Sequence, residues 1–253
     1  HKNWPNGQSK QGEEKMNILD KVQRGKVAKP RRICVYGSHG VGKTTWASRF
    51  PDALVIATED GSGDIDVARL SVDSALEVLQ ATNEASTSEF KTIIIDSIDW
   101  FEKFVEDALH AEGFQQDFGK GTVEVARRIG KLFEQLDLCI SAGKTVILIA
   151  HEETKKVESV SGASWDRVQP KLSKKACGRL LEWADEVLHA EIETFVSSKD
   201  EGFGRERGIA TTSGRRILKS DSHPSYVSKR RIELADKIDM NDPVECFLTS
   251  TTK

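Results

Sequence analysis

Apolar residues recur along this chain with two alternating periods. Short runs of apolar and β-branched residues predict strands buried on both faces, at residues 33–36, 53–58, 92–96 and 145–150. Apolar positions at helical spacing lie between these runs and predict amphipathic helices at residues 43–49, from Ser74 onward, at 101–109 and at 125–136. The helix after Ser74 opens on the capping-box pattern Ser74-x-x-Glu77. Alternating strands and helices predict an α/β fold with a mostly parallel central sheet flanked by helices.

The second half of the chain is patterned differently. Residues 151–170 show no apolar period, which predicts a long loop of the kind that is functional or mobile. Residues 187–195 alternate and predict a more exposed strand. Residues 208–212 and 215–219 predict a hairpin that turns at Ser213-Gly214. We therefore expect antiparallel edge strands near the C-terminus.

The beginning of the chain differs from the rest. Residues 1–15 are polar and lack the apolar core of a signal peptide. We interpret them as a disordered arm or a remnant of cloning. The remaining residues, 16–253, have the length of one α/β domain with additions, so we expect a single domain there.

The turn after the first predicted strand carries the phosphate-binding pattern G-x-x-x-x-G-K-[ST]. Glycines allow successive backbone N–H groups to face phosphate oxygens, a lysine reaches the β- and γ-phosphates, and a hydroxyl binds Mg²⁺. The helix that follows directs its positive end at the anion. The pattern predicts a nucleotide-binding loop made of Gly37, Ser38, His39, Gly40, Val41, Gly42, Lys43, Thr44 and Thr45, with Lys43 also in a catalytic role.

Two carboxylates are expected to serve this loop. Asp96 ends the third predicted strand, at the edge of the sheet where ligands bind, and we expect it to hold Mg²⁺ together with Thr44. Asp99 is interpreted as the cap of the next helix. Glu59 directly follows the second predicted strand, where a carboxylate can orient an attacking water. The alternative for Glu59 is an ordinary solvated loop acid.

Composition and charge narrow the classes of protein. The chain has 37 basic and 40 acidic side chains, a net charge of −3, and no apolar run long enough for a membrane helix. Its four cysteines lie far apart, which argues against a zinc site or a disulfide scaffold and is typical of a reducing cytosol. The charge is uneven, because residues 151–180 hold seven basic and four acidic residues, and residues 199–231 hold nine and four. A nucleic acid would bind through such local basic segments.

Six segments, in this order, resemble the RecA-like core ATPases, in particular the small phage-encoded ATP-binding proteins associated with single-strand annealing and recombination. They are GSHGVGKTT (37–45), LVIATEDG (54–61), TIIIDSIDW (92–100), FGKG (118–121), TVILIAHEETKK (145–156) and SYVSKRR (225–231). The resemblance covers roughly residues 30–235. It implies a RecA-like P-loop domain over residues 16–253 that uses ATP and Mg²⁺.

The resemblance also implies roles for single residues. The family's catalytic carboxylate follows the second strand, which points to Glu59. A polar residue after the fourth strand senses the γ-phosphate and couples it to DNA; the matching residue is His151, where RecA has Gln. Lys229 and Arg231 loosely match cations that RecA-like subunits place on a neighbour's γ-phosphate, and a plain basic patch is the alternative.

The family's two DNA-contacting loops correspond to about residues 113–121 and 152–175. Their mixture of basic and aromatic side chains suits single-stranded DNA with stacked bases, although a solvated surface loop remains the alternative. The candidate DNA-binding residues are Phe114, Phe118, Lys120, Lys155, Lys156, Trp165, Arg167, Lys171, Lys174 and Lys175.

These expectations combine into one predicted function. The protein would bind and hydrolyse ATP with Mg²⁺, bind single-stranded DNA as a ring or filament of identical subunits, and promote annealing or recombination. We expect stimulation by DNA, a single-strand-binding protein as a candidate partner, no membrane, and the host-cell cytoplasm as the location of a phage-encoded protein. Two alternatives stay open: a P-loop small-molecule kinase with residues 151–170 as an acceptor lid, and a nucleotide-dependent scaffold or helicase-loader type protein.

Overall fold

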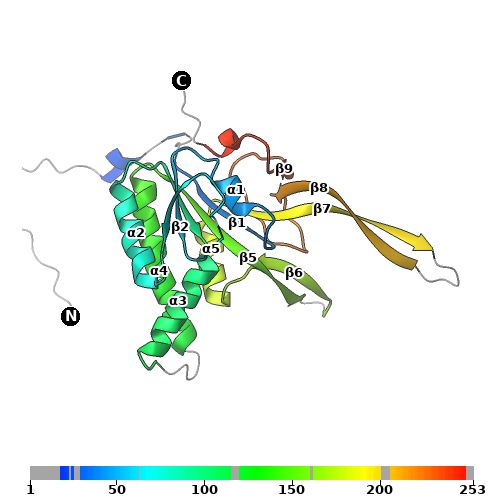
Figure 1. The fold of residues 1–253 in the computed structure, drawn as a ribbon, viewed down its shortest axis with the longest axis horizontal. Coiled ribbons are helices and arrows are strands. Elements are labelled where there is room, and N and C mark those ends of the chain that lie inside the picture. The colour runs from blue at the N-terminus through cyan, green and yellow to red at the C-terminus, as the bar shows by residue number, and fades with distance from the viewer. Residues whose placement is uncertain are drawn as a thin grey trace, which may run out of the picture.

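The computed structural model describes residues 18–22, 24–25, 29–61, 63–114, 120–159, 162–200 and 206–248. Residues 1–15 and Phe118, for which the sequence predicted an arm and a DNA contact, lie outside these ranges. A short 3₁₀ turn, η1 (Ile18–Lys21), precedes the folded domain. Within the described ranges the strands form one nine-stranded sheet with helices on both faces (Figure 1). The fold predicted from the sequence is confirmed.

The sheet is parallel in its centre and antiparallel at one edge. The parallel strands are β1 (Arg32–Gly37), β2 (Ala53–Ala57), β3 (Ala68–Ser71), β4 (Thr92–Asp96), β5 (Thr145–Glu158) and β7 (Glu186–Asp200). The antiparallel strands are β6 (Ser164–Pro170), β8 (Glu206–Lys219) and β9 (Lys237–Asp239). The order is β3-β2-β4-β5-β1-β7-β8-β9, with β6 paired to the far part of β5. The order places β5 between the strand of the phosphate-binding loop and the strand of Asp96.

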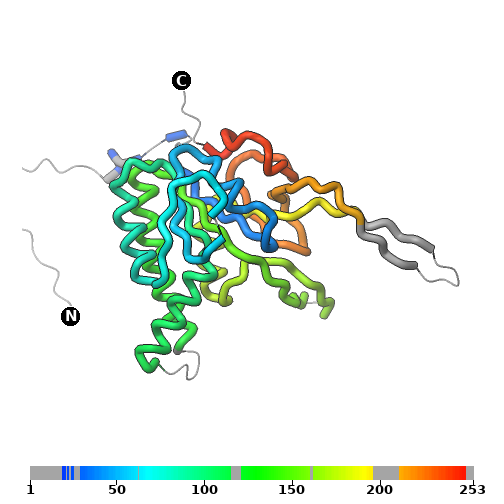
Figure 2. Tube along the Cα trace, in the orientation of Figure 1, coloured from blue at the N-terminus to red at the C-terminus, as the bar shows by residue number. Residues whose placement is uncertain are grey.

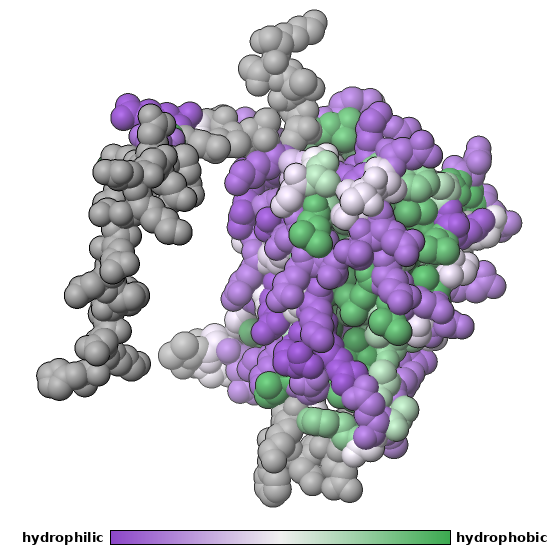
Figure 3. Space-filling view, turned by 90° about the vertical axis from the view of Figure 1, so that its left-hand side faces the viewer, coloured by the Kyte–Doolittle hydropathy of each residue, from purple (hydrophilic) through white to green (hydrophobic). Residues whose placement is uncertain are grey.

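Four helices cover one face of the sheet: α2 (Ala75–Thr87), α3 (Ile98–Ala111), α4 (Lys120–Ser141) and α5 (Lys174–Trp183). Ile93 and Ile95 of β4 pack into this layer, whereas Ile94 packs on the opposite face, as alternation along a strand requires. Ser74 caps α2 by accepting from the Glu77 amide, as its capping-box pattern predicted. Seen from the side of α2, the outer surface is largely hydrophilic, with a band of hydrophobic residues across it (Figure 3). No helix in the described ranges is long and apolar enough to cross a membrane.

The opposite face is covered by α1 (Lys43–Ala47), which follows the phosphate-binding loop, and by the C-terminal segment with η3 (Val244–Phe247). Figure 2 shows this red C-terminal segment beside the blue N-terminal part of the domain. Trp46 packs edge-to-face on Phe50 and Phe247, and Arg49 donates to the carbonyls of Met240, Asn241 and Asp242. The C-terminal segment therefore braces the short helix that carries the nucleotide site.

The prediction of a long loop at residues 151–170 is wrong. The fourth predicted strand does not stop at Ala150 but continues as β5 to Glu158, and β6 returns beside it as an antiparallel ribbon. Burial still alternates along this part of β5, but charged residues such as Lys155 and Lys156 occupy the alternating positions. An apolar period could not reveal such a strand. The proposed second DNA-contacting loop is thus a β-ribbon followed by the start of α5.

The prediction of a hairpin that turns at Ser213-Gly214 is also wrong. Both predicted strands belong to the single strand β8, whose partner is β7. The register shifts between the pairs Ile192↔Arg216 and Thr194↔Thr212, so Ser213 and Gly214 form a bulge. Gly214 has φ 75°, a backbone conformation that a bulge and a turn share, which explains the misreading. The edge strand β3 was missed because all four of its residues are exposed.

Candidate nucleotide site

The phosphate-binding loop lies at the carboxyl end of β1 and depends on its glycines. A Cβ on Gly37 would stand 2.2 Å from the carbonyl oxygen of Ala190 on β7, so the neighbouring strand leaves room for glycine alone. Gly40 and Gly42 adopt φ 72° and 98°, the left-handed region that glycine enters without strain. Gly42 is the N-cap of α1, which directs the N-terminal amides of that helix into the loop.

Lys43, Thr44 and Asp96 come together across the end of the sheet, as the sequence predicted. The Lys43 ammonium donates to the carbonyls of Gly37 and Ser38, both at 2.9 Å, and burial lowers its pKa. The Thr44 hydroxyl donates to Asp96 Oδ2 at 2.6 Å. Burial raises the pKa of Asp96 above its usual value, although Thr44 and Lys43 oppose the shift. A buried carboxylate of this kind favours a cation close to it.

These residues fit the Mg²⁺ that a phosphate-binding loop requires. Among the residues that the structure describes, no group of three or more His, Cys, Asp or Glu side chains is arranged to hold a metal by itself. Thr44 and Asp96 supply one hydroxyl and one carboxylate, both oxygen ligands that Mg²⁺ prefers. The remaining ligands would come from phosphate oxygens and water, as is usual for nucleotide-bound magnesium.

A cavity of about 350 Å³ adjoins the loop and contains the predicted catalytic carboxylate. Glu59, Asp60 and Gly61 follow β2 and form one wall, while Asp96 and His151 form another. Burial raises the pKa of Glu59 above its usual value, although nearby His151 opposes the shift. The structure thus places Glu59 beside the phosphate-binding loop and not on an open loop surface.

His151 is held at this cavity by Asp99. Asp99 accepts from the backbone amide of His151 at 3.0 Å and lies 2.8 Å from the His151 Nδ1. Burial alone would raise the pKa of Asp99, but the hydrogen bonds from His151 outweigh it and hold that pKa below its usual value. An ionised Asp99 places the proton on Nδ1 and turns Nε2 toward Glu59, 3.6 Å from its Oε1. That separation is longer than a direct hydrogen bond.

His39 of the phosphate-binding loop completes this group. Its ring stacks on His151 with the ring centroids 3.8 Å apart, and the neighbouring imidazole lowers its pKa.

The expectation that Asp99 caps α3 is wrong, because Ser97 is the N-cap and the Asp99 side chain accepts from His151. Sequence reasoning also missed Arg216, which lines the same cavity from β8. Asp99 and Arg216 both lie outside the phosphate-binding motif.

The candidate DNA-binding residues occupy three places. Phe114 is exposed beyond α3, and Lys120 is the first residue of α4. On the β5–β6 ribbon, Lys155 pairs with Glu153 at 2.6 Å, Lys156 is exposed, and Arg167 lies over the Trp165 ring. The exposed lysines Lys171, Lys174 and Lys175 flank the start of α5. The three lysines near α5 thus lie together, whereas the basic side chains of the ribbon are interspersed with Glu153, Glu158 and Asp166.

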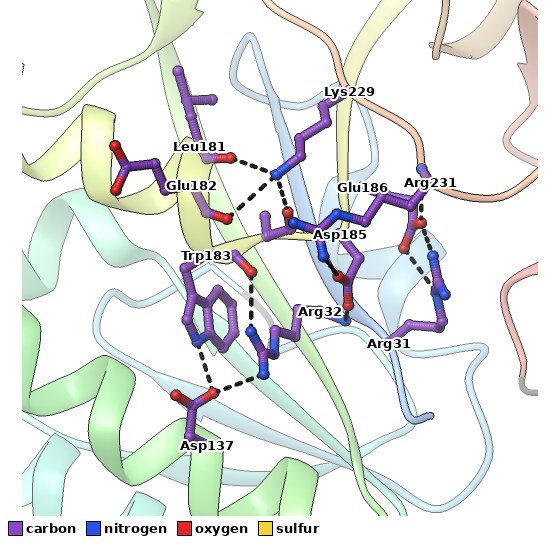
Figure 4. Close-up of polar contacts among 11 residues, drawn as sticks. Arg31, Arg32, Asp137, Leu181, Glu182, Trp183, Asp185, Glu186, Lys229 and Arg231 are labelled. Carbon is purple, nitrogen blue, oxygen red and sulfur yellow. Dashed lines mark hydrogen bonds and ion pairs between the residues drawn. The ribbon is translucent and has the colours of Figure 1, made fainter. Parts of the chain in front are cut away.

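Lys229 and Arg231, the predicted intersubunit cations, have partners within the chain (Figure 4). The Lys229 ammonium donates to the carbonyls of Leu181, Glu182 and Ala184 at 2.7, 3.3 and 2.6 Å, where α5 ends. Arg231 pairs with Asp185 at 2.9 Å. In the same group, Arg31 pairs with the fully buried Glu186. The structure gives these residues an intramolecular role, and a contact with a neighbouring subunit stays a prediction.

The phosphate-binding loop between β1 and α1, with acidic side chains at the carboxyl edge of a parallel sheet, defines a P-loop nucleotide-binding domain. A family model described as an AAA domain, AAA_24, matches residues 29–232, and the chain belongs to this family of P-loop ATPases. The SPbeta prophage-derived uncharacterized protein YorG of Bacillus subtilis strain 168 is 27% identical over 195 residues, which cover 69% of this chain. The chain spans about half of that relative, 53% of its length.

Two solved structures are similar to this chain. The KaiC-like protein PH0186 from Pyrococcus horikoshii OT3 is 13% identical with a TM-score of 0.40, covering 75% of this chain and 85% of its own. The flagellar accessory protein FlaH from Methanocaldococcus jannaschii is 12% identical with a TM-score of 0.40, covering 82% of this chain and 92% of its own. Both likenesses are distant.

Proposed function

We propose that the protein is a Mg²⁺-dependent ATPase that binds single-stranded DNA as a homo-oligomer and serves annealing or recombination, with DNA stimulating hydrolysis. One observation carries the proposal: a single strand joins the two sites. β5 brings His151 to the nucleotide cavity and continues into the ribbon that carries Lys155 and Lys156. A shift of His151 toward a γ-phosphate would therefore move the ribbon directly.

The residues at the cavity support hydrolysis. The partly buried carboxylate of Glu59 in the nucleotide cavity supports a role in orienting the attacking water, and Asp99 holds His151 with its Nε2 toward that carboxylate. Lys43 and the amides of α1 would bind phosphate oxygens. A Mg²⁺ ion held by Thr44 and Asp96 would neutralise negative charge on the phosphates.

A second cavity, of about 660 Å³, adjoins the nucleotide cavity and shares His39 and His151 with it. Trp100, Lys103, Lys155 and Lys171 line it together with four carboxylates, those of Asp99, Glu102, Glu106 and Glu153. Its position beside His151, and not its charge, supports a DNA segment there. Three lysines lie near the start of α5, where the Glu102 carboxylate accepts from the Ser173 amide, and they offer positive charge to DNA phosphates. The similar protein YorG is prophage-derived, which supports a phage-encoded protein.

ATP hydrolysis measured with and without single-stranded DNA tests the proposal. We expect wild-type hydrolysis to rise with DNA, and Glu59→Gln to lower the rate roughly a hundredfold or more while ATP affinity stays within a few fold, because the amide cannot act on the water. Asp60→Asn, on the same cavity wall, is the matched control. Absence of DNA binding and of stimulation at low salt would refute the proposal, and phosphate transfer to a small acceptor would favour the kinase alternative.

The DNA surface is tested by replacing Lys171, Lys174 and Lys175 with alanine together. If each contacts a phosphate, the slope of log affinity against log salt becomes shallower by about 2. Lys131→Ala, on the exposed face of α4, is the control and should leave the slope unchanged. An unchanged slope in the triple variant would place the DNA elsewhere on the protein.

A further inference from the structure

Strand β8 contains a bulge immediately before Arg216. Three residues of β8, Ser213 to Arg215, stand opposite Glu193 alone, because the pairing passes from Thr194↔Thr212 to Ile192↔Arg216. Hydrogen bonds within the bulge fix its shape: the Gly214 amide donates to the Thr212 hydroxyl, and the Arg215 amide donates to the Ser213 hydroxyl. A bulge beside a ligand site re-aims the side chain that follows it.

The two neighbouring arginines differ in their partners. Arg215 pairs with Asp239 at 3.1 Å and with Glu193 at 3.6 Å. Lys219, further along the strand, pairs with Glu191 at 2.7 Å. Across the described part of the chain, no carboxylate or carbonyl pairs with the Arg216 guanidinium. Arg215 and Lys219 are thus neutralised by carboxylates, whereas the charge of Arg216 has no partner among the residues that the structure describes.

Arg216 lies against the phosphate-binding loop. A Cβ on Gly42 would stand 3.2 Å from the Arg216 Nη1 and 3.6 Å from its Cδ, so the glycine at this position leaves space for the arginine. The side chain lines the cavity of about 350 Å³ together with Lys43, Thr44 and Thr45. A second fixed cation there adds to the positive field of the loop, and an anion is the group that would neutralise both.

We propose that Arg216 is a nucleotide ligand supplied by the same chain: its guanidinium binds phosphate oxygens of the nucleotide held by the P-loop. Guanidinium groups match phosphate oxygens with two parallel N–H donors, which a lysine cannot do. The proposal rests on the proposed ATP site and names one more residue of it. It requires no contact from a neighbouring subunit, so it applies to the monomer.

Binding of ATP and of inorganic tripolyphosphate tests this role. Compared with wild type, Arg216→Gln should weaken both ligands about tenfold to a hundredfold, the effect of losing a charge-assisted hydrogen bond. Arg216→Lys should recover part of the lost affinity, because the lysine restores the positive charge but not the two parallel N–H donors of the guanidinium. Arg215→Gln, a paired neighbour on the same strand, should stay within about twofold of wild type. Without ligand, the thermal unfolding midpoint of Arg216→Gln should match wild type.

The outcomes separate this inference from the proposed function. If Lys43→Ala abolishes ATP binding but Arg216→Gln binds ATP like wild type, the role of Arg216 is refuted and the ATP site stands. If Lys43→Ala leaves ATP binding intact, the ATP site itself fails. Weakened ATP binding with unchanged tripolyphosphate binding would put Arg216 against the base and overturn its assignment to phosphate.

Discussion

At the scale of single residues, the site is organised around His151. Its Nδ1 is fixed by Asp99, its Nε2 faces Glu59, and its ring stacks on His39 of the phosphate-binding loop. An imidazole held on three sides has one orientation and one tautomer. Asp99 acts through His151 and is therefore a positioning residue.

Asp99→Asn tests this positioning. An amide can donate to Nδ1 and so stabilise the other tautomer, which would put the proton on the nitrogen that faces Glu59. We expect kcat for ATP hydrolysis to fall roughly tenfold or more while ATP affinity changes little. Asp99→Glu, which keeps the carboxylate, should recover part of the rate. Equal losses in ATP affinity and kcat would instead mean that Asp99 only supports the fold.

The sequence predicted the residues of this site that belong to short motifs. Lys43 and Thr44 are adjacent in one motif, Asp96 ends the buried strand β4, and Glu59 lies just beyond β2, so the ends of a parallel sheet bring them together. Asp99 and Arg216 could not be predicted in the same way. Their roles depend on which strand lies beside which, and on a bulge whose glycine resembles a turn.

At the scale of secondary-structure elements, the end of α5 depends on Lys229. The last carbonyls of a helix have no partner within the helix. Here the Lys229 ammonium donates a hydrogen bond to three carbonyls at the end of α5. Because Lys229 also exchanges backbone hydrogen bonds with Val187, it ties α5 to the start of β7. This junction lies at the amino ends of β1 and β7, away from the nucleotide cavity.

Lys229→Met should destabilise the protein without affecting ATP binding. The methionine keeps most of the apolar stem but leaves three carbonyls without their donor, at a cost of about 1–3 kcal/mol in the free energy of unfolding. Arg231→Met removes an exposed ion pair and should cost about 1 kcal/mol or less. Urea unfolding measures both. If Lys229→Met unfolds like wild type yet loses DNA-stimulated hydrolysis, the predicted intersubunit role would be supported instead.

Among the elements, the buried strands and the helices α1 to α4 were predicted correctly, whereas the helix α5 and the polar strands were not. β4 is buried along its whole length and was evident from its isoleucines. The far half of β5, the strand β6 and the edge strand β3 present mainly polar or exposed residues, because they pack little against the core. Backbone pairing with a neighbouring strand stabilises them, and an apolar period does not report that pairing.

At the scale of the whole molecule, two β-ribbons extend beyond the helical layers. The β5–β6 ribbon and the longer β7–β8 ribbon leave the sheet on the same side (Figure 1). Before it leaves the core, the β7–β8 ribbon exposes Ile192 and Phe195, with 43% and 54% of their surfaces accessible. Because the two residues are three positions apart along β7, they point to opposite faces of the ribbon. Phe195, the more exposed of the two, is the candidate apolar contact for the proposed self-association.

Sedimentation velocity measures that self-association directly. With a non-hydrolysable ATP analogue and single-stranded DNA, we expect wild type to sediment as an oligomer. Lys43→Ala, which should not bind the analogue, should remain a monomer under the same conditions. Phe195→Asp should weaken assembly at least tenfold in protein concentration, because it removes buried apolar contact and adds a charge. Leu138→Asp, an equally exposed apolar position on α4, is the control. A wild-type monomer with both ligands present would contradict assembly, and equal effects of the two aspartates would place the contact elsewhere.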